Sequence, residues 1–354
     1  MAFIANEGVA PKGERFDRSA LVKNAESKKY KRTKLGDFIY SSNNLESGSI
    51  GLNKYGNASI SPVYSIFYPT DFADSDFIGR YFLRKDFIGQ MIRWRQGVVY
   101  GQWKIPEVDF LNMNIHVPSK EEQEKIGQIL DGIDNTITLQ QRKLNSLQKL
   151  KKGLLQKMFP KNGENIPEIR FPEFSDAWKQ RKFGEFVERK SDSALSSTSI
   201  PSVEYEDVES ETGILKKDIY VKTEFKKGVL FSDNDVLYGK LRPYLHNWLA
   251  PSFTGVAVGD WWVLSPKNCS KDFLYRLLQT LTFDVIANQT SGTKMPRADW
   301  NLVSSTAFYI PSSIEEQEKI GSLFNRIDNT ITLQQRKLES LQKLKKGLLQ
   351  QMFI

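Results

Sequence analysis

Residues 121–159 read EEQEKIGQILDGIDNTITLQQRKLNSLQKLKKGLLQKMF, and residues 315–353 read EEQEKIGSLFNRIDNTITLQQRKLESLQKLKKGLLQQMF. The two stretches lie 194 residues apart and differ at 7 of 39 positions, which leaves 32 identities. A repeat of this length sets the architecture before any local feature does. We therefore expect a chain that is built twice from the same kinds of part.

Both stretches carry apolar residues on two interleaved seven-residue series, which is the pattern of a coiled-coil helix. Serine followed three positions later by glutamate, in Ser119 with Glu122 and in Ser313 with Glu316, predicts where each helix starts. The predicted seam consists of Ile126, Leu130, Ile133, Ile137, Leu144, Leu147, Ile320, Phe324, Ile327, Ile331, Leu338 and Leu341.

Polar residues interrupt this seam at Gln140 and Lys151, and again at Gln334 and Lys345. We expect them to set the register at some cost in stability. Each helix would be roughly 58 Å long. Two such helices in one chain most simply pair with each other. The alternative is a pair of ordinary core helices, for which the apolar stripe is too narrow and too long.

Chain polarity predicts the geometry of the pair, because a globular segment precedes each helix. An antiparallel pair would place those two heads at opposite ends of a spacer. The expected fold class is mixed α/β (α+β): two heads in tandem, separated by two long helices in an antiparallel coiled coil with approximate two-fold symmetry. The expected segments are a first head over 1–118, a helix over 119–159, a linker over 160–172, a second head over 173–311 and a helix over 312–354.

Composition sets the broad class of the protein. The chain has 354 residues, of which 40% are hydrophobic and 12% aromatic, enough for packed cores in two or more domains. Its formal net charge of +8 weakly favours a polyanionic partner. One cysteine and two histidines argue against a disulfide framework and against a His/Cys zinc site. We find no signal peptide and no apolar run long enough to span a membrane, which fits a cytoplasmic protein.

Turn residues divide the heads into short elements. Expected strands are residues 38–40, 58–61, 64–68, 229–238 and 255–263, and expected helices are residues 76–93 and 271–287.

The heads repeat as well, though weakly. Phe38-Ile39-Tyr40 matches Val236-Leu237-Tyr238, and the motif that contains Pro106 matches the one that contains Pro296. The counterpart of residues 178–201 would lie ahead of Met1, so we expect the first head to be short of its opening strand.

The order of head, helix, head and helix resembles the DNA-specificity subunit of type I restriction-modification systems. The resemblance covers essentially the whole chain and also includes the linker with Ile169, Phe171 and Trp178, and the run Leu237–Pro243. It implies that each head is a target-recognition domain that reads one half of a bipartite site in double-stranded DNA. The shortened beginning departs from the family pattern in the first of these domains.

The resemblance also implies partners. The helices would separate the half-sites and dock two methyltransferase subunits, and up to two restriction subunits would complete the nuclease. No cofactor is expected on this chain itself: S-adenosylmethionine would belong to the methyltransferase, and ATP and Mg to the nuclease. In agreement, the sequence has no glycine-rich nucleotide motif and no methyltransferase tetrapeptide, so we expect it to be non-catalytic alone.

The candidate DNA-binding residues are basic, amide and aromatic side chains that crowd together in each head, because arginine can fork onto guanine, asparagine onto adenine, and lysine mainly meets phosphate. In the first head they are Arg93, Arg95, Gln102 and Lys104, beside Trp94 and Trp103. In the second head they are Tyr238, Lys240, Arg242, Tyr244, Asn247, Lys294 and Arg297, beside Trp248. For each residue, a solvated charge or a core aromatic is about as well supported. Pro243 and the pair Trp261-Trp262 are interpreted as structural.

Two readings stay open at this point. Six basic residues and no acidic one lie between Arg142 and Lys157, which could track phosphate, meet an acidic partner or form a solvated face. The chain as a whole could also be a coiled-coil scaffold that binds proteins without reading DNA. Salt-dependent binding to duplex DNA distinguishes the two functions.

Overall fold

The computed structural model describes residues 2–4, 8–11, 29–98, 102–161, 163–289 and 295–353. The chain divides into two compact units. Unit 1 consists of Met1–Leu139 with Leu338–Ile354, and unit 2 of Gln140–Lys337. Each unit thus combines one head with a part of both long helices, whereas the sequence-based segments separated heads from helices.

The two long helices begin where the sequence predicts. Helix α4 spans Lys120–Lys157 and helix α9 spans Ile314–Met352. The Ser119 hydroxyl accepts a hydrogen bond from the Glu122 amide at 3.4 Å, and the Ser313 hydroxyl accepts one from the Glu316 amide at 3.3 Å. Each serine therefore satisfies one of the unpaired amides of the first turn.

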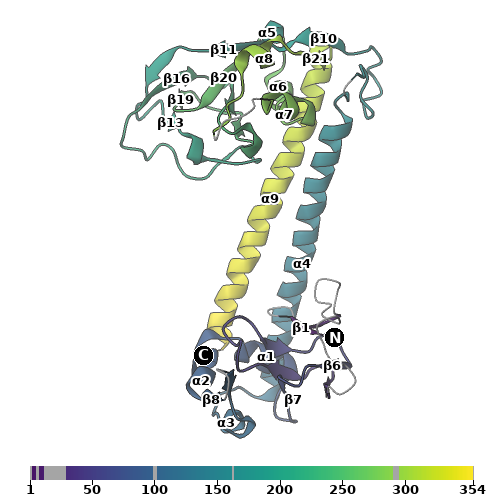
Figure 1. The fold of residues 1–354 in the computed structure, drawn as a ribbon, viewed down its shortest axis with the longest axis vertical. Helices are drawn as coiled ribbons and strands as arrows, with labels where there is room; N and C mark the ends of the chain where they lie inside the picture. The colour runs from purple at the N-terminus through teal and green to yellow at the C-terminus, as the bar shows by residue number, and fades with distance from the viewer. Residues whose placement is uncertain are drawn as a thin grey trace. The chain divides into compact units, whose positions relative to one another are not determined.

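Within each unit, α4 and α9 run side by side in opposite directions (Figure 1). In unit 1, Asp134 of α4 pairs with Lys345 of α9 at 2.5 Å. In unit 2, Lys151 of α4 pairs with Asp328 of α9 at 2.7 Å. Between these pairs α4 advances by 17 residues while α9 goes back by 17, so the helices are antiparallel and the register is the same in both units.

The predicted seam residues lie in the interior of the helix pair or against the heads. Seven of them are buried: Ile126, Leu130, Leu144, Ile320, Phe324, Ile327 and Leu338. The other five, Ile133, Ile137, Leu147, Ile331 and Leu341, are half-buried. Among the seam's polar residues, both lysines form the ion pairs described above. Gln140 and Gln334 each have a buried side-chain oxygen without a hydrogen-bond partner among the described residues.

The head of unit 1 has short strands followed by short helices: β1 (Ala2–Ile4), β2 (Gly8–Ala10), β3 (Lys31–Thr33), β4 (Phe38–Tyr40), β5 (Ile50–Leu52), β6 (Ala58–Ile60), β7 (Ser65–Phe67), α1 (Ser75–Phe82), α2 (Lys85–Arg93), β8 (Gln96–Val98), β9 (Gln102–Lys104) and α3 (Glu107–Leu111). The described strands form a sheet of order β5-β4-β7 and three two-stranded ladders, β1-β2, β3-β6 and β8-β9.

Strand β4 organises the core of this head. Its alternate residues Phe38 and Tyr40 pack with Phe87 of α2 and Phe110 of α3, whereas Ile39 packs on the opposite side with Ile60 of β6. This alternation is what a strand with both faces buried requires.

The head of unit 2 contains β10 (Lys179–Lys182), α5 (Phe183–Phe186), β11 (Val187–Lys190), β12 (Ser193–Leu195), β13 (Ser202–Val203), β14 (Val208–Glu209), β15 (Ile214–Leu215), β16 (Lys227–Phe231), β17 (Val236–Gly239), β18 (Trp248–Leu249), β19 (Gly255–Ala257), β20 (Trp261–Pro266), α6 (Lys271–Leu277), α7 (Leu281–Ala287), α8 (Trp300–Ser305) and β21 (Ala307–Ile310). Two four-stranded sheets, β11-β20-β17-β18 and β12-β16-β19-β13, make up its centre.

Strand β17 plays the same part here as β4 does in unit 1. Val236 and Tyr238 face a cluster with Phe273 of α6 and Phe283 of α7. Leu237, between them, faces the second sheet and packs with Phe231. The repeated Phe38–Tyr40 and Val236–Tyr238 triplets therefore occupy the same place in the two heads.

Several predicted elements are divided by turns in the structure. The predicted helix over 76–93 is two helices, α1 and α2, and the one over 271–287 is α6 and α7. The predicted strand over 229–238 is β16 and β17, joined by a turn that the Asp235 carboxylate closes on the Ser232 amide at 2.7 Å. The strand over 255–263 is β19 and β20, and Gly259 turns between them at φ 93°.

An arginine of the head anchors unit 1 to its long helices. Arg80 of α1 donates to Asp134 at 2.8 Å and to Asp131 at 2.6 Å, both on α4. Because Asp134 also receives Lys345 of α9, its carboxylate links the head with both helices. The Arg80 side chain is only 10% exposed, whereas Asp131 and Asp134 are 50% and 33% exposed, so the guanidinium is shielded from water and the carboxylates are partly solvated.

Unit 2 contains the same network. Arg276 of α6 donates to Asp328 at 2.6 Å and to Asn325 at 2.5 Å, both on α9. Lys151 of α4 completes the pairing at Asp328. A buried charge is stable only with such partners, so these contacts fix how each head lies on its helix.

We predict that Asp134→Asn destabilises unit 1 and leaves unit 2 unchanged. Burial works to raise the pKa of Asp134, but hydrogen bonds from Lys345 and Arg80 outweigh it and hold the pKa below the ordinary 3.8. A carboxylate with a lowered pKa stabilises the folded state at pH values above its ordinary pKa. This stabilisation is lost as the pH falls. The substitution should therefore cost about 1–3 kcal/mol at neutral pH and progressively less below pH 3.8.

Hydrogen exchange measured by mass spectrometry checks this unit by unit. Asp134→Asn should speed exchange in α1 and the first half of α4, and the matched variant Asp328→Asn should speed it in α6 and the first half of α9. Equal effects of either variant on both units would contradict two separate anchors.

Candidate nucleic-acid interface

Two separate candidate segments of the second head meet at one surface loop. The loop follows β17 and contains the short 3-10 helix Pro243–Leu245. The Arg242 amide donates to the Pro296 carbonyl at 2.7 Å, and the Ala298 amide donates to the Lys240 carbonyl at 2.8 Å. A β-bridge between Leu241 and Arg297 joins the two segments. Lys240, Arg242, Tyr244 and Arg297 thus form one group, here called the Arg242 cluster.

The backbone of this loop is held in an unusual conformation. Arg242 and His246 adopt left-handed φ angles of 47° and 54°, which are uncommon for residues other than glycine. The Tyr205 hydroxyl donates to the Leu241 carbonyl at 2.5 Å, and Pro243 is buried as predicted. Strained, fixed backbone of this kind is typical of functional loops.

The charges of the Arg242 cluster are only partly compensated. Asp260 pairs with Arg297 at 3.2 Å and with Lys240 at 3.8 Å. The Arg297 side chain is 54% exposed and donates from two nitrogens to Asp260, at 3.2 and 3.3 Å, so solvent screens part of this ion pair. Arg242 has a buried Nε without a partner among the described residues, and Tyr244 is 52% exposed. The cluster therefore presents positive charge and an aromatic ring to solvent.

Two candidates of the second head lie inside it instead. Tyr238 is 2% exposed and stacks on Trp262, since the alternation along β17 turns it toward the helices, and burial raises its pKa. Asn247 is 4% exposed and accepts a hydrogen bond from Ser210 at 2.9 Å. Neither side chain is available to a base, which corrects the expectation from sequence. Lys294 lies outside the described residues.

The candidates of the first head gather at the end of α2 and on the hairpin β8-β9 that follows it. Arg93, Gln102 and Lys104 are exposed. Trp94 and Trp103, neighbours of these residues, are 46% and 49% exposed. Strand β9 ends at Lys104, and Ile105 and Pro106 follow it, so the repeated proline motif comes directly after the hairpin in the first head.

Arg95 differs from the other candidates of this group. Its side chain is only 10% exposed and pairs with Glu46 at 3.1 Å. Two of its side-chain nitrogens are buried without a partner among the described residues, and its contact with DNA stays a prediction.

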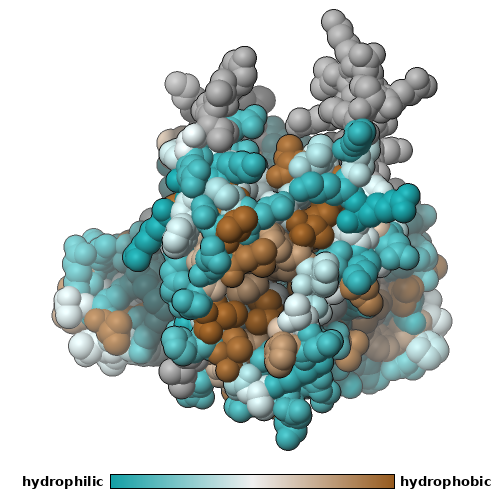
Figure 2. Space-filling model, turned by 90° about the horizontal axis from the view of Figure 1, so that it is seen from below, coloured by the Kyte–Doolittle hydropathy of each residue, from teal (hydrophilic) through white to brown (hydrophobic). Residues whose placement is uncertain are grey.

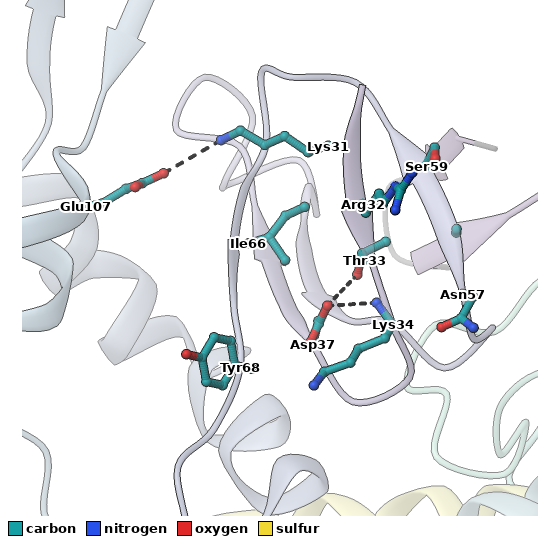
Figure 3. A pocket seen from close by; sticks show the side chains of 11 residues that line it. Lys31, Arg32, Thr33, Lys34, Asp37, Asn57, Ser59, Ile66, Tyr68 and Glu107 are labelled. Carbon is teal, nitrogen blue, oxygen red and sulfur yellow. Dashed lines mark hydrogen bonds and ion pairs between the residues drawn. The ribbon is translucent and has the colours of Figure 1, made fainter. Parts of the chain in front are cut away.

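Sequence reasoning did not single out a hollow of about 1160 Å³ in unit 1 (Figure 3). Its lining mixes both charges with an aromatic ring: Lys31, Arg32, Lys34, Asp37, Tyr68 and Glu107 contribute to it. Lys34 lies 5.5 Å from the centre of the Tyr68 ring, and Lys31 lies 3.7 Å from Glu107. The basic run Lys31–Lys34 was the only local sequence feature that could have indicated this hollow. The carboxylates Asp37 and Glu107 distinguish it from a groove lined by basic residues alone.

Metal binding and thiol chemistry can be assessed in the described part of the chain. No group of three or more His, Cys, Asp or Glu residues there could hold a metal ion. Burial raises the pKa of the Cys269 thiol to about 12, so it is a poor nucleophile at neutral pH. No described helix is both long enough and apolar enough to cross a membrane.

Most of the chain matches the protein family described as "Type I restriction modification DNA specificity domain", over residues 4–149 and 175–343. The chain is 26% identical over 269 residues to the type I restriction enzyme MjaVIII specificity subunit of Methanocaldococcus jannaschii, which covers 69% of this chain and 63% of that protein. It is 22% identical over 256 residues to the putative MjaX specificity subunit of the same organism, with coverages of 70% and 60%. The chain thus spans less than two thirds of the length of these relatives.

The fold is similar to that of two solved structures. One is the S subunit of a type I restriction-modification system from M. genitalium, with a TM-score of 0.60 and 16% identity over 92% of this chain and 84% of that one. The other is a chain from a type I restriction-modification system, with a TM-score of 0.51 and 16% identity over 93% and 84%. The two ranges that match the family, 4–149 and 175–343, each contain one head and most of the long helix that follows it. This chain belongs to the family of type I restriction-modification DNA specificity proteins.

Proposed function

We propose that this chain reads a bipartite site in double-stranded DNA, one half-site with each head. The observation that carries the proposal is the Arg242 cluster: an arginine fixed in a strained loop, a second arginine held only by an exposed ion pair, and an exposed tyrosine. Guanidinium groups can fork onto guanine in the major groove, and the ring can pack on sugar or base. The exposed Arg93, Gln102 and Lys104 supply donors of the same kind in unit 1.

The repeat supports reading by both heads. Each unit repeats the strand alternation, the proline motif and the arginine anchor. The two heads therefore hold their surface loops on a similar framework. The protein-scaffold alternative explains the helices equally well. It offers no reason for exposed hydrogen-bond donors beside aromatic rings in both heads.

We predict that Arg242→Ala weakens binding to the specific site by about 1–3 kcal/mol and relaxes one position of one half-site. Arg242→Lys is the matched variant, because it keeps the charge and loses the planar fork. If Arg242 forks a guanine, both variants lose specificity at that position. If it meets phosphate, Lys should restore binding while Ala weakens it equally for all sequences.

Fluorescence anisotropy with specific and random duplexes, each at several salt concentrations, separates these outcomes. The unaltered chain should bind random duplex with an affinity that falls steeply as salt increases. Salt-independent binding, or no binding to any duplex, would favour the scaffold instead. Lys179→Ala, an exposed lysine of β10, is the control for the loss of one surface charge.

We further propose that the helix pair carries two equivalent docking sites for a methyltransferase subunit, one beside each unit. The observation that supports this is the shared register: α4 and α9 make the same ion pair twice, once in each unit, so a surface that includes one pair recurs at the other. Restriction subunits would then join this assembly, at most two per chain. S-adenosylmethionine, ATP and Mg would be held by those partners, and this chain would contribute no catalytic group.

Light scattering of the reconstituted methyltransferase tests the symmetry. We expect a mass of one such chain with two methyltransferase subunits when the partner is saturating. A complex that remains one to one under saturation would contradict two equivalent sites. The chain alone, as a control, should neither methylate nor cut DNA.

A further inference from the structure

The first segment of the second head contributes an edge strand at three places. Strand β10 pairs with β21, with Lys179 opposite Ile310. Strand β11 pairs with β20, and β12 pairs with β16. The short helix α5 lies between β10 and β11. Residues 179–195 therefore cover three strand edges of unit 2 in succession.

Unit 1 repeats the strands that receive this segment. Strand β7 pairs with β4 as β20 pairs with β17, and β3 pairs with β6 as β16 pairs with β19. Within the described ranges of unit 1, however, β7 pairs only with β4 and β3 only with β6. Residues 113–119, which precede α4 as β21 precedes α9, form no strand. All three edges that residues 179–195 cover in unit 2 are thus open in the described part of unit 1.

Apolar surface accompanies these open edges. In unit 2, the Phe183 amide of α5 donates to the Thr306 carbonyl at 2.9 Å, and its ring packs against Trp300 of α8. In unit 1, α3 takes the place of α8, and its Val108 and Leu111 are 67% and 68% exposed. Figure 2 looks at the molecule from the side on which α3 lies in Figure 1 and shows hydrophobic side chains gathered there.

The hollow of unit 1 lies along two of the open edges. Lys31 of β3, Ile66 of β7 and Glu107 of α3 line it, together with Asp37 (Figure 3). Asp37 precedes β4 as Asp235 precedes β17. Its Oδ2 accepts hydrogen bonds from the Lys34 amide at 2.7 Å and the Thr33 hydroxyl at 3.0 Å.

Asp235 has an ion-pair partner, Lys190, whose counterpart Asp37 lacks among the described residues. Asp235 accepts from Ser232 in the same way and in addition pairs with Lys190 of β11 at 2.7 Å. Asp37 is 5% exposed, and no ion pair to it exists among the described residues. A buried carboxylate favours a cation beside it. The hollow therefore has a place for a lysine that enters with a strand along β7.

From these observations we infer that these edges of unit 1 are a binding site for a strand-forming peptide segment whose chemistry is that of residues 179–195. Such a segment has a basic strand, a turn with Phe-x-x-Phe, and a second strand that ends in lysine. Its backbone would extend the sheets at β7 and β3, its phenylalanines would cover α3, and its lysine would pair with Asp37. Addition of a strand to an exposed edge is an established mode of peptide binding.

A polypeptide fits this surface better than a nucleic-acid strand does. The open edges present backbone donors and acceptors at strand spacing, which another strand satisfies. The hollow mixes Lys31, Arg32 and Lys34 with the carboxylates Asp37 and Glu107, whereas a groove for phosphate would be uniformly basic. The inference concerns this surface alone and does not rest on DNA reading by either head.

The test uses the full chain and a labelled synthetic peptide with the sequence of residues 177–196. Anisotropy should show saturable binding, and hydrogen exchange should slow in β3, in β7 and over residues 113–117. The strands of unit 2 should be unaffected, which excludes exchange of the peptide with the chain's own segment. Replacing Lys190 by Met in the peptide leaves the protein intact and should weaken binding about tenfold, the effect of one charged hydrogen bond.

Two further peptides and one protein variant complete the design. A peptide with Phe183 and Phe186 changed to Ser, and one of scrambled sequence, should not bind measurably. With Asp37→Asn in the chain, the native and Lys190→Met peptides should bind alike. Absence of saturable binding, equal binding of the scrambled peptide, or protection of β3 and β7 by duplex DNA in place of the peptide would overturn the inference.

Discussion

The carboxylate of Asp134 in unit 1, and that of Asp328 in unit 2, each hold three parts of the structure together. Each accepts an arginine from the head and a lysine from the other long helix. Buried or half-buried charges are costly when they lose a partner, so the head, α4 and α9 must keep one mutual arrangement within each unit. Because the contact occurs twice in the same register, the two units are built alike although their heads share little sequence.

This constraint leaves the surface of each head free to vary. The strand alternation at β4 and β17 fills the core, and the arginine anchors fix the base of the head. The Arg242 cluster and the β8-β9 hairpin lie on loops that neither the core nor the anchor uses. Binding residues concentrate on loops that a rigid scaffold positions, so this frame suits the DNA recognition proposed above.

Much of the fold could be predicted from the sequence, because the sequence of the long helix occurs twice and its heptads and caps are local patterns. The anchors could not be, since Arg80 and Asp134 lie 54 residues apart and no local pattern joins them. Tyr238 was misassigned as a surface residue because its basic and aromatic neighbours suggested a binding loop. The continuous apolar run Val236-Leu237-Tyr238 is typical of a strand that is buried on both faces, as β17 is, and that signal was present in the sequence.

We propose that two like units read two half-sites at a spacing set by α4 and α9. Sequencing of methylated sites, in cells that carry the chain and its partners, measures that spacing directly. Insertion of one heptad into both helices adds about 10 Å, so the gap between half-sites should grow by up to about three base pairs at ~3.4 Å each. The half-site sequences should stay the same. An unchanged gap, or altered half-sites, would contradict the account.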